Sequence, residues 1–246
     1  MIILKCRDIM KSFPIKRGYI QEEIGAVKAV DGVSLAIEKG EVFGLVGESG
    51  CGKTTLGKII LGVLKQDSGT VDLATRRIQA VFQDPFNSLD PKMKVSDILT
   101  EGLILQKKSG TQKKIEEILD LIRLPQGSLN KYPHQFSGGE RQRIAIGRAV
   151  LTEPEFIVCD EPVSSLDVTI QLQILHLLKD VQKRFGMTYL FISHDLRVVK
   201  YMCNRVAVMY QGKIVEEGPV EGVYSNPVNL YTQQLLSSIL EVYPQR

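Results

Sequence analysis

Residues that could hold a phosphate group lie together in one short segment, Gly47 to Thr54, which reads GESGCGKT. The segment fits the pattern G-x-x-x-x-G-K-[ST] and lies between an apolar run typical of a buried strand and a run with helical spacing. Glycines let successive backbone N–H groups turn inward around phosphate oxygens, and the following helix adds the positive end of its dipole. Lys53 can then reach the β- and γ-phosphates, and the Thr54 hydroxyl can ligate Mg²⁺. The predicted nucleotide-binding residues of this loop are Gly47, Glu48, Ser49, Gly50, Cys51, Gly52, Lys53, Thr54 and Thr55, with Cys51 as a small filler.

A phosphate-bound Mg²⁺ needs a second anchor on the protein, and the apolar run FIVCDE ends in Asp160 and Glu161. Alternation along a strand would point these two carboxylates to different sides. We expect Asp160 to face the metal through water, and Glu161 to face the attacking water as general base. The segment SSLD then predicts the start of a helix at Asp167, for which a plain helix-end charge is a competing role.

Strands that alternate with helices must position these motifs, which predicts an α/β fold with a mainly parallel sheet and helices on both faces. Residues 14–27 indicate a hairpin or loop in a small antiparallel β-subdomain. After Gly52 the spacing predicts a helix with one apolar side, formed by Leu56, Ile59, Ile60 and Val63. A block rich in Lys, Glu, Ile and Leu interrupts the alternation and predicts an inserted helical subdomain.

The composition excludes several classes of protein. The chain has 246 residues and a net charge of +3, which gives no broad electrostatic case for a nucleic-acid binder. None of the four cysteines lies in a CxxC pair, which indicates reduced and mostly buried thiols. No apolar stretch approaches the ~20 residues that span a bilayer, and the start is too soon interrupted by charge for a secretory signal. We expect a cytosolic protein, or one that partners hold at a membrane.

A second glycine-rich segment, FSGGERQR, resembles the signature motif LSGGQ-x-x-R of ATP-binding cassette (ABC) ATPases. The other motifs follow in the order of that family over nearly the whole chain. They are the phosphate loop at 47–55, Gln83, the signature at 136–140, the acidic strand at 156–161, SSLD at 164–167 and His194. The resemblance implies a P-loop NTPase with a RecA-like sheet, in a single ABC nucleotide-binding domain over 1–246. Its predicted parts are a catalytic core at 1–85 and 153–225, a helical signature subdomain at 86–152 and a C-terminal tail at 226–246.

The resemblance also implies that two such chains face each other head to tail. Each ATP would lie between the phosphate loop of one chain and the signature of the other. Ser137, Gly138, Gly139 and Glu140 would thus serve a nucleotide held by the partner chain, and Ser137 with the glycine N–H groups would form a second anion site. Phe136 stands where the family has Leu and Glu140 where it has Gln, and a carboxylate is less comfortable near phosphates.

Further side chains take their roles from the resemblance, each with an alternative. Gln83 resembles the glutamine that touches Mg²⁺ or the water, and is otherwise a surface amide. His194 resembles the switch histidine that contacts the γ-phosphate, and is otherwise a core or loop histidine. Phe13 resembles the aromatic that stacks on adenine, with Tyr19 as the fallback and packing in the β-subdomain as the alternative. Asp167 joins the residues expected to contact nucleotide.

Within the family, the region around the phosphate loop, the hairpin at 14–27 and the segment NPVNLYTQQLLSSI resemble peptide and nickel importer ATPases. Only a few residues lie between Gly69 and Ile78, so we expect a trimmed antiparallel subdomain. The cysteine-bearing tail that many peptide importers carry is missing, so we expect no iron–sulfur cluster, and the short form leans mildly toward nickel or metallophore import.

The resemblance therefore implies an ATP-hydrolysing subunit of an ABC importer of peptides or nickel chelates, with ATP and Mg²⁺ as ligands. Its implied partners are a second ATPase chain (a paralogue, or else a copy), two membrane permeases and, indirectly, an extracytoplasmic solute-binding protein, with no nucleic acid. Its implied location is the cytoplasmic face of the cell membrane, as a peripheral protein. Two alternatives stay open: a soluble ABC ATPase of DNA repair or translation, and the catalytically weak half of a heterodimer.

Overall fold

The computed structural model describes the chain except residues 18–21, 85–87, 106–111 and 243–246. The chain forms two compact units. Unit 1 comprises Met1–Arg76 and Leu190–Arg246, and unit 2 comprises Arg77–Tyr189. The predicted division into core, helical subdomain and tail stays a prediction, and Tyr19 lies outside the described residues.

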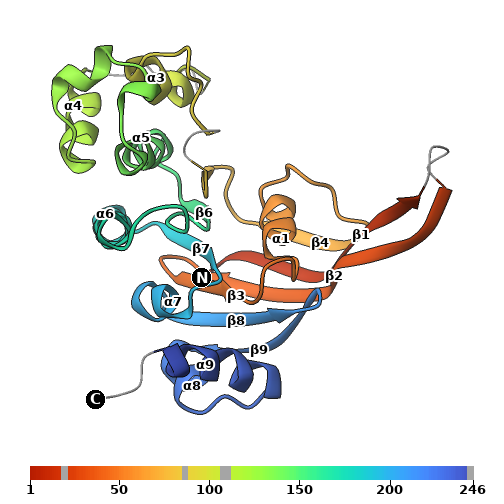
Figure 1. Ribbon diagram of the computed structural model, residues 1–246. Coiled ribbons are helices and arrows are strands. Elements are labelled where there is room, and N and C mark those ends of the chain that lie inside the picture. Colours follow the sequence, from red (N-terminus) through yellow and green to blue (C-terminus); the bar gives the residue numbers. More distant parts are fainter. Residues whose placement is uncertain (18–21, 85–87, 106–111, 243–246) are drawn as a thin grey trace. The chain divides into compact units, whose positions relative to one another are not determined.

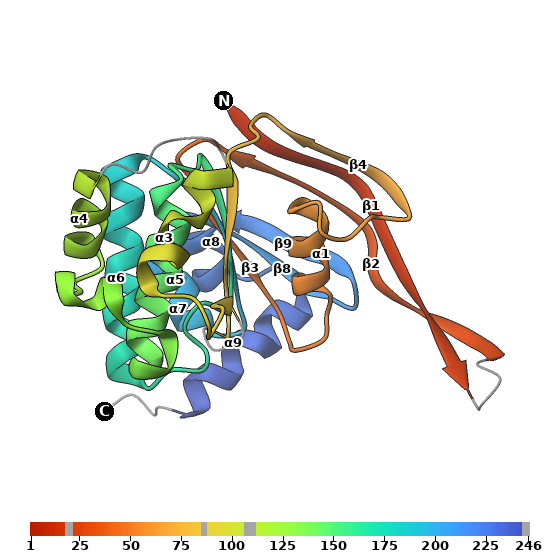
Figure 2. The ribbon, with the colours of Figure 1, turned by 90° about the horizontal axis from the view of Figure 1, so that it is seen from above.

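Unit 1 contains a three-stranded antiparallel sheet with the order β2-β1-β4. Strands β1 (Ile2–Arg17) and β2 (Glu22–Glu38) form the long hairpin that Figure 2 shows, and β4 (Ser68–Leu73) pairs with the other edge of β1. The predicted antiparallel subdomain is confirmed. The link from β4 to the next strand is short, at residues 74–77, in agreement with the trimmed form that we expected.

The second group of strands in unit 1 carries the phosphate loop at its end. Strand β3 (Val42–Val46) is buried throughout and pairs in parallel with β8 (Arg205–Tyr210), as a continuous apolar run predicts. Strand β8 turns into the antiparallel β9 (Lys213–Pro219) through Gln211 and Gly212, which have φ values of 45° and 82°. Left-handed residues at both turn positions suit a tight hairpin.

Four helices lie in the described part of unit 1, and the last two lie beside β9 (Figure 1). They are α1 (Lys53–Ile60), α7 (Leu196–Met202), α8 (Val220–Ser225) and α9 (Leu230–Val242). Strand β7 (Thr188–Ser193) belongs to unit 1 from Leu190 onward, and its first two residues belong to unit 2. Helix α1 ends at Ile60, so Val63 is 72% exposed and the prediction that it shares the apolar side of this helix is wrong.

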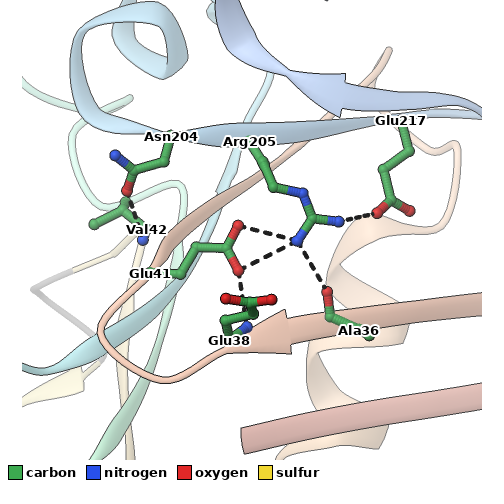
Figure 3. Close-up of polar contacts among 7 residues, drawn as sticks. All are labelled: Ala36, Glu38, Glu41, Val42, Asn204, Arg205 and Glu217. Carbon is green, nitrogen blue, oxygen red and sulfur yellow. Dashed lines mark hydrogen bonds and ion pairs between the residues drawn. The ribbon is translucent and has the colours of Figure 1, made fainter. Parts of the chain in front are cut away.

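A cluster of charged side chains lies at the N-terminal ends of β3 and β8, opposite the phosphate loop (Figure 3). The Arg205 guanidinium donates to both carboxylate oxygens of Glu41, at 3.1 and 3.4 Å, and also to Glu217. Glu41 in turn accepts from the backbone N–H of Glu38 at 2.8 Å. Because Arg205 begins β8 and Glu217 lies on β9, one side chain joins the β2–β3 turn to the β8–β9 hairpin.

Unit 2 combines two parallel strands with a group of helices. Strand β5 (Ile78–Phe82) pairs with β6 (Phe156–Asp160), so that Phe82 lies opposite Asp160. Helix α5 (Gly138–Leu151) packs against α3 (Val95–Leu105), α4 (Gln112–Leu121) and α6 (Val168–Phe185). Short 3-10 turns at Gln126–Asn130 and Pro133–Gln135 precede α5.

Helix α6 has the boundaries that its sequence indicates. The Asp167 carboxylate accepts from the N–H of Ile170 at 3.0 Å, and the left-handed Gly186 ends the helix. Among the described residues, no helix has the length and apolar character to cross a membrane. Mostly parallel strand pairs, helices and a small antiparallel sheet confirm the predicted α/β class.

Candidate active site

The phosphate loop joins β3 to α1 in unit 1, and its glycines have conformations that side chains rarely adopt. Gly47, Gly50 and Gly52 have φ values of 151°, 83° and 112°. A Cβ atom at Gly47 would collide with the carbonyl oxygen of Met209, and one at Gly52 with that of Ala29. Glycine is thus required at both positions, and the backbone approaches its neighbours closely enough to form a fixed cradle.

Lys53 begins α1 and its side chain turns back into the loop. Its ammonium donates to the carbonyl oxygens of Gly47 and Glu48, at 2.7 and 2.8 Å, and only 4% of the residue is exposed. Thr54 follows it in the first turn of the helix and is exposed. The loop is held from outside as well, because the Gly212 N–H donates to the Cys51 carbonyl at 3.0 Å. The arrangement places a cation and a helix N-terminus together, which suits an anion.

Unit 1 also carries two other predicted site residues. Phe13 lies on β1 opposite Val27 and is 41% exposed, with the Lys11 ammonium 5.7 Å from its ring centre. Stacking of Phe13 on a base therefore stays a prediction, as does the alternative that it packs in the β-subdomain. His194 is exposed directly after β7, which excludes the core position that the sequence left open.

Unit 2 brings Asp160, Glu161 and Gln83 to one edge of the β5–β6 pair. Asp160 is the last residue of β6 and is 8% exposed, whereas Gln83 directly follows β5 and is exposed. Glu161 has a φ of 49°, so it lies outside the strand. Strand alternation therefore does not apply at Glu161, because this residue follows the strand in a left-handed conformation, and the different roles of the two carboxylates stay a prediction. A positive φ in a residue other than glycine is strained, and such strain concentrates at functional sites.

Gln142, which the sequence analysis did not identify, connects these segments. Its Nε2 donates to the Phe82 carbonyl at 3.2 Å and to the Pro162 carbonyl at 2.7 Å, and the residue is 0% exposed. Phe82 precedes Gln83 and Pro162 follows Glu161, so one buried amide fixes both chain segments. The Ser165 hydroxyl adds a bond of 3.0 Å to the Gln83 carbonyl. One sequence signal could have revealed the role of Gln142. It is a polar residue three positions after Gly139, on the side of the helix that is buried.

The signature segment forms the N-terminus of α5, with Ser137 as its cap. The Ser137 N–H and hydroxyl both donate to the Glu140 carboxylate, at 2.9 and 2.8 Å, and the Glu140 N–H lies 3.4 Å from the Ser137 oxygen. This is a reciprocal capping box. The backbone N–H of Ser137 is the main cause that lowers the pKa of Glu140, whose side chain is therefore an anion at neutral pH. Phe136 is buried, which fits an apolar side chain at the position where the family motif has Leu.

Gly139 of the signature is needed for close packing. A Cβ atom at Gly139 would lie 2.5 Å from Cγ2 of Ile170, on the first turn of α6. Ser137 is exposed and Gly138 partly so, which leaves the helix N-terminus open to a ligand. Asp167 caps α6, which agrees with the competing role of a charge at a helix end. A contact between Asp167 and a nucleotide stays a prediction.

The predicted Mg²⁺ ligands are a hydroxyl (Thr54), an amide (Gln83) and a carboxylate (Asp160). These are hard oxygen donors, and no group of three or more His, Cys, Asp or Glu residues that could hold a metal occurs among the described residues. Mg²⁺ prefers such oxygen donors and is usually held by one or two carboxylates together with substrate phosphates and water. The residues present therefore fit this ion. Gln83 and Asp160 lie together in unit 2, and Thr54 belongs to unit 1.

Comparison with known proteins gives a consistent result. A family model described as ABC transporter matches residues 30–164. The oligopeptide transport ATP-binding protein OppF of Bacillus subtilis (strain 168) is 47% identical over 235 residues, which cover 87% of this chain and 77% of OppF. The oligopeptide transport ATP-binding protein AppF of the same organism is 44% identical over 256 residues, covering 96% of this chain and 78% of AppF.

Solved structures agree with these relatives. The ADP conformation of MJ1267, an ATP-binding cassette of an ABC transporter, has a TM-score of 0.76 at 28% identity, covering 95% of this chain and 99% of that one. The dimeric post-hydrolysis state of the cassette MJ0796, bound to ADP and Pi, has a TM-score of 0.75 at 26% identity, covering 88% and 98%. The predicted resemblance to ABC ATPases of the peptide-importer branch is confirmed, and the chain belongs to the ABC transporter family as an ATPase of the ABC type.

Proposed function

We propose that this chain is the ATP-hydrolysing subunit of an importer that takes up peptides. The observation that best supports this proposal is the sequence identity of 44–47% to two oligopeptide transport ATP-binding proteins, which extends over most of the chain. The importer's solute would be a peptide because both relatives are named for oligopeptide transport. Import of nickel or another metal chelate is the alternative outcome of the transport assay below.

In the proposed reaction the phosphate loop binds the triphosphate through its N–H groups, and Lys53 donates to the β- and γ-phosphates. Glu161 accepts the proton of a water whose oxygen attacks the γ-phosphorus, and ADP leaves as inorganic phosphate forms. His194 and Gln83 orient that water and the γ-phosphate. Thr54, Gln83 and, through water, Asp160 would hold Mg²⁺, which neutralises charge on the phosphates. Phe13 would stack on the adenine.

The proposed active assembly contains two ATPase chains arranged head to tail. Support comes from the exposed Ser137 at the N-terminus of α5, where the backbone N–H groups of the first turn would donate to a γ-phosphate held by the partner. The Ser137 hydroxyl donates to the Glu140 carboxylate in this structure and would exchange that acceptor for the phosphate. Asp167, at the start of the neighbouring α6, would lie at the same junction. We further propose that the partner is a paralogue and that ATP-driven closure acts on two membrane permeases at the cytoplasmic face, with a binding protein supplying the solute.

Variants of the catalytic carboxylate test the chemistry. Glu161→Gln keeps the shape of the side chain but removes the proton acceptor, so it should bind ATP, form a stable dimer and lose turnover. Unchanged turnover would reject Glu161 as the base. Mixing a Lys53→Ala chain with a Ser137→Ala chain tests the shared pocket, because one of the two mixed compartments keeps both intact halves. If both parents are folded and the variants form mixed dimers, but the mixture never recovers activity, the two-chain site is wrong.

Transport identifies the solute. The chain should co-purify with its permeases, and proteoliposomes that contain the complex should accumulate a labelled oligopeptide in an ATP-dependent manner. Accumulation of nickel or a nickel chelate instead would move the assignment to the other importer type. ATPase stimulation by DNA or ribosomes, without permeases, would favour the soluble alternative.

A further inference from the structure

The C-terminal helix of unit 1 begins at a fixed point on β9. The Glu216 carboxylate accepts from the backbone N–H groups of Val228 and Asn229, at 2.8 and 3.0 Å. Asn229 then caps the helix, because its side-chain oxygen accepts from the N–H of Tyr231 at 2.9 Å. Four residues far from the phosphate loop in sequence therefore fix the position and direction of the first turn of α9.

Tyr231, on that first turn, reaches the phosphate loop. Its phenol oxygen accepts a hydrogen bond of 3.1 Å from the backbone N–H of Glu48. Its ring packs on Tyr210 at the end of β8, with ring centres 4.1 Å apart and planes inclined by 31°. Burial is the main cause that raises the pKa of Tyr231, so the phenol is neutral at physiological pH. The bond thus joins a neutral acceptor to a backbone donor.

The Gly47–Glu48 peptide group is bound at both ends. Its N–H belongs to Glu48 and donates to Tyr231, whereas its carbonyl belongs to Gly47 and accepts from the Lys53 ammonium at 2.7 Å. A rotation of this peptide plane would break both bonds at once. Because Gly47 has no side chain, little else in the local backbone opposes such a rotation.

We propose that Tyr231 is a positioning residue for nucleotide binding, which fixes the Gly47–Glu48 peptide group and, through it, the Lys53 ammonium. The C-terminal helix then sets the affinity of the phosphate loop. The inference rests on the proposed use of this loop for nucleotide. Hydrogen bonds in a chain polarise one another, so the phenol also strengthens the carbonyl as an acceptor for Lys53. A loop held before binding loses less conformational freedom when phosphate arrives.

Tyr231→Phe removes the acceptor and keeps the ring on Tyr210. The probe is a fluorescent ADP analogue with Mg²⁺, since ADP has no γ-phosphate and its binding does not depend on hydrolysis. One lost hydrogen bond predicts an increase in Kd of about 3- to 10-fold. The melting temperature should fall by no more than about 3 °C. Glu216→Ala releases the helix start without touching the loop, and should raise Kd in the same direction.

Tyr224→Phe is the matched control, because the Tyr224 hydroxyl donates to the Leu196 carbonyl at 2.6 Å in the same unit, without contact to the loop. Its Kd should stay within about 1.5-fold of the parent value. Equal changes in Kd for the two phenylalanine variants, or no change in either, would overturn the role of Tyr231. If Lys53→Ala binds the analogue as tightly as the parent, the proposed nucleotide site itself fails, whatever Tyr231 does.

Hydrogen exchange keeps the test decisive if Tyr231→Phe also lowers stability. In that variant the Glu48 amide should exchange faster, while the amides of β3 keep their protection. A uniform increase over both segments would mean that the phenol contributes only to general stability and would refute the positioning role.

Discussion

Replacing Gln142 by leucine should loosen the part of unit 2 that carries Asp160 and Glu161, the carboxylates that we propose for the active site. The Gln142 amide is fully buried and donates to the carbonyls of Phe82 and Pro162, at 3.2 and 2.7 Å. Leucine has similar volume and no donor. Both carbonyls would therefore lose their bond to this side chain, and water does not readily replace it at the buried Pro162 carbonyl.

The magnitude follows from the burial of each acceptor. The Pro162 bond is buried and short, so leaving its carbonyl without this donor costs about 1–3 kcal/mol, whereas the part-buried Phe82 carbonyl accounts for about 0.5–1.5 kcal/mol. An opposing contribution comes from Oε1 of Gln142, which is buried and has no hydrogen-bond partner in the described part of the chain. Its removal recovers part of the cost, so the free energy of unfolding should fall by about 2–3 kcal/mol.

Gln142→Glu should be more harmful at neutral pH, because it turns a carboxylate toward two carbonyl oxygens. Burial beside these dipoles raises the pKa of the new carboxyl in the folded protein above its unfolded value. A group with a raised folded pKa contributes its full stability below the unfolded pKa and loses it as pH rises through the folded pKa. The glutamate variant should therefore approach the leucine variant in stability near pH 4 and fall below it at pH 8.

Urea unfolding followed at pH 4 and pH 8 measures these differences, and steady-state ATPase rates give the functional consequence. We expect kcat to fall, since Gln83 and Glu161 adjoin the two released carbonyls. Gln182→Leu is the control, because its amide donates to the Met187 carbonyl at the distant end of α6. If the leucine variants at 142 and 182 have equal stability and equal kcat, Gln142 does not hold the site together.

Three other changes test separate features. Arg205→Met removes the partner of the nearly buried Glu41, so the free energy of unfolding measured in urea should fall by about 1–3 kcal/mol at pH 7. Gly52→Ala places a side chain against the Ala29 carbonyl at a φ of 112°, so titration with ADP should show no binding and unfolding should require about 2–4 kcal/mol less. Glu140→Ala removes the capping box of α5, so at pH 7 this variant should be less stable than the parent by about 1 kcal/mol. Because the pKa of Glu140 is lowered in the folded protein, the stabilisation is fully present above the unfolded pKa and is lost as pH falls through the folded pKa. The unfolding free energies of the parent and the variant should therefore converge between pH 5 and pH 3.

Patterns that act over a few residues allowed accurate predictions from the sequence. The phosphate loop and the cap at Asp167 each depend on backbone geometry that nearby residue types dictate. Periodicity was less reliable at an element's end, since α1 stops at Ile60 and leaves Val63 exposed. Glu161 shows the same limit, because a strand pattern contains no information about the left-handed residue that ends it.

The contacts that the sequence could not reveal share one physical character, because they bind the main chain of a motif from a distance. Gln142 holds carbonyls beside Gln83 and Glu161, and Tyr231 holds an N–H within the phosphate loop. A backbone group is the same chemical object at every position, so no residue type in the motif indicates which side chain will bind it. Motif residues therefore identify the reaction, whereas the rigidity of the site depends on polar side chains elsewhere in the chain. Conservative changes at those side chains should alter affinity and turnover while every motif stays intact.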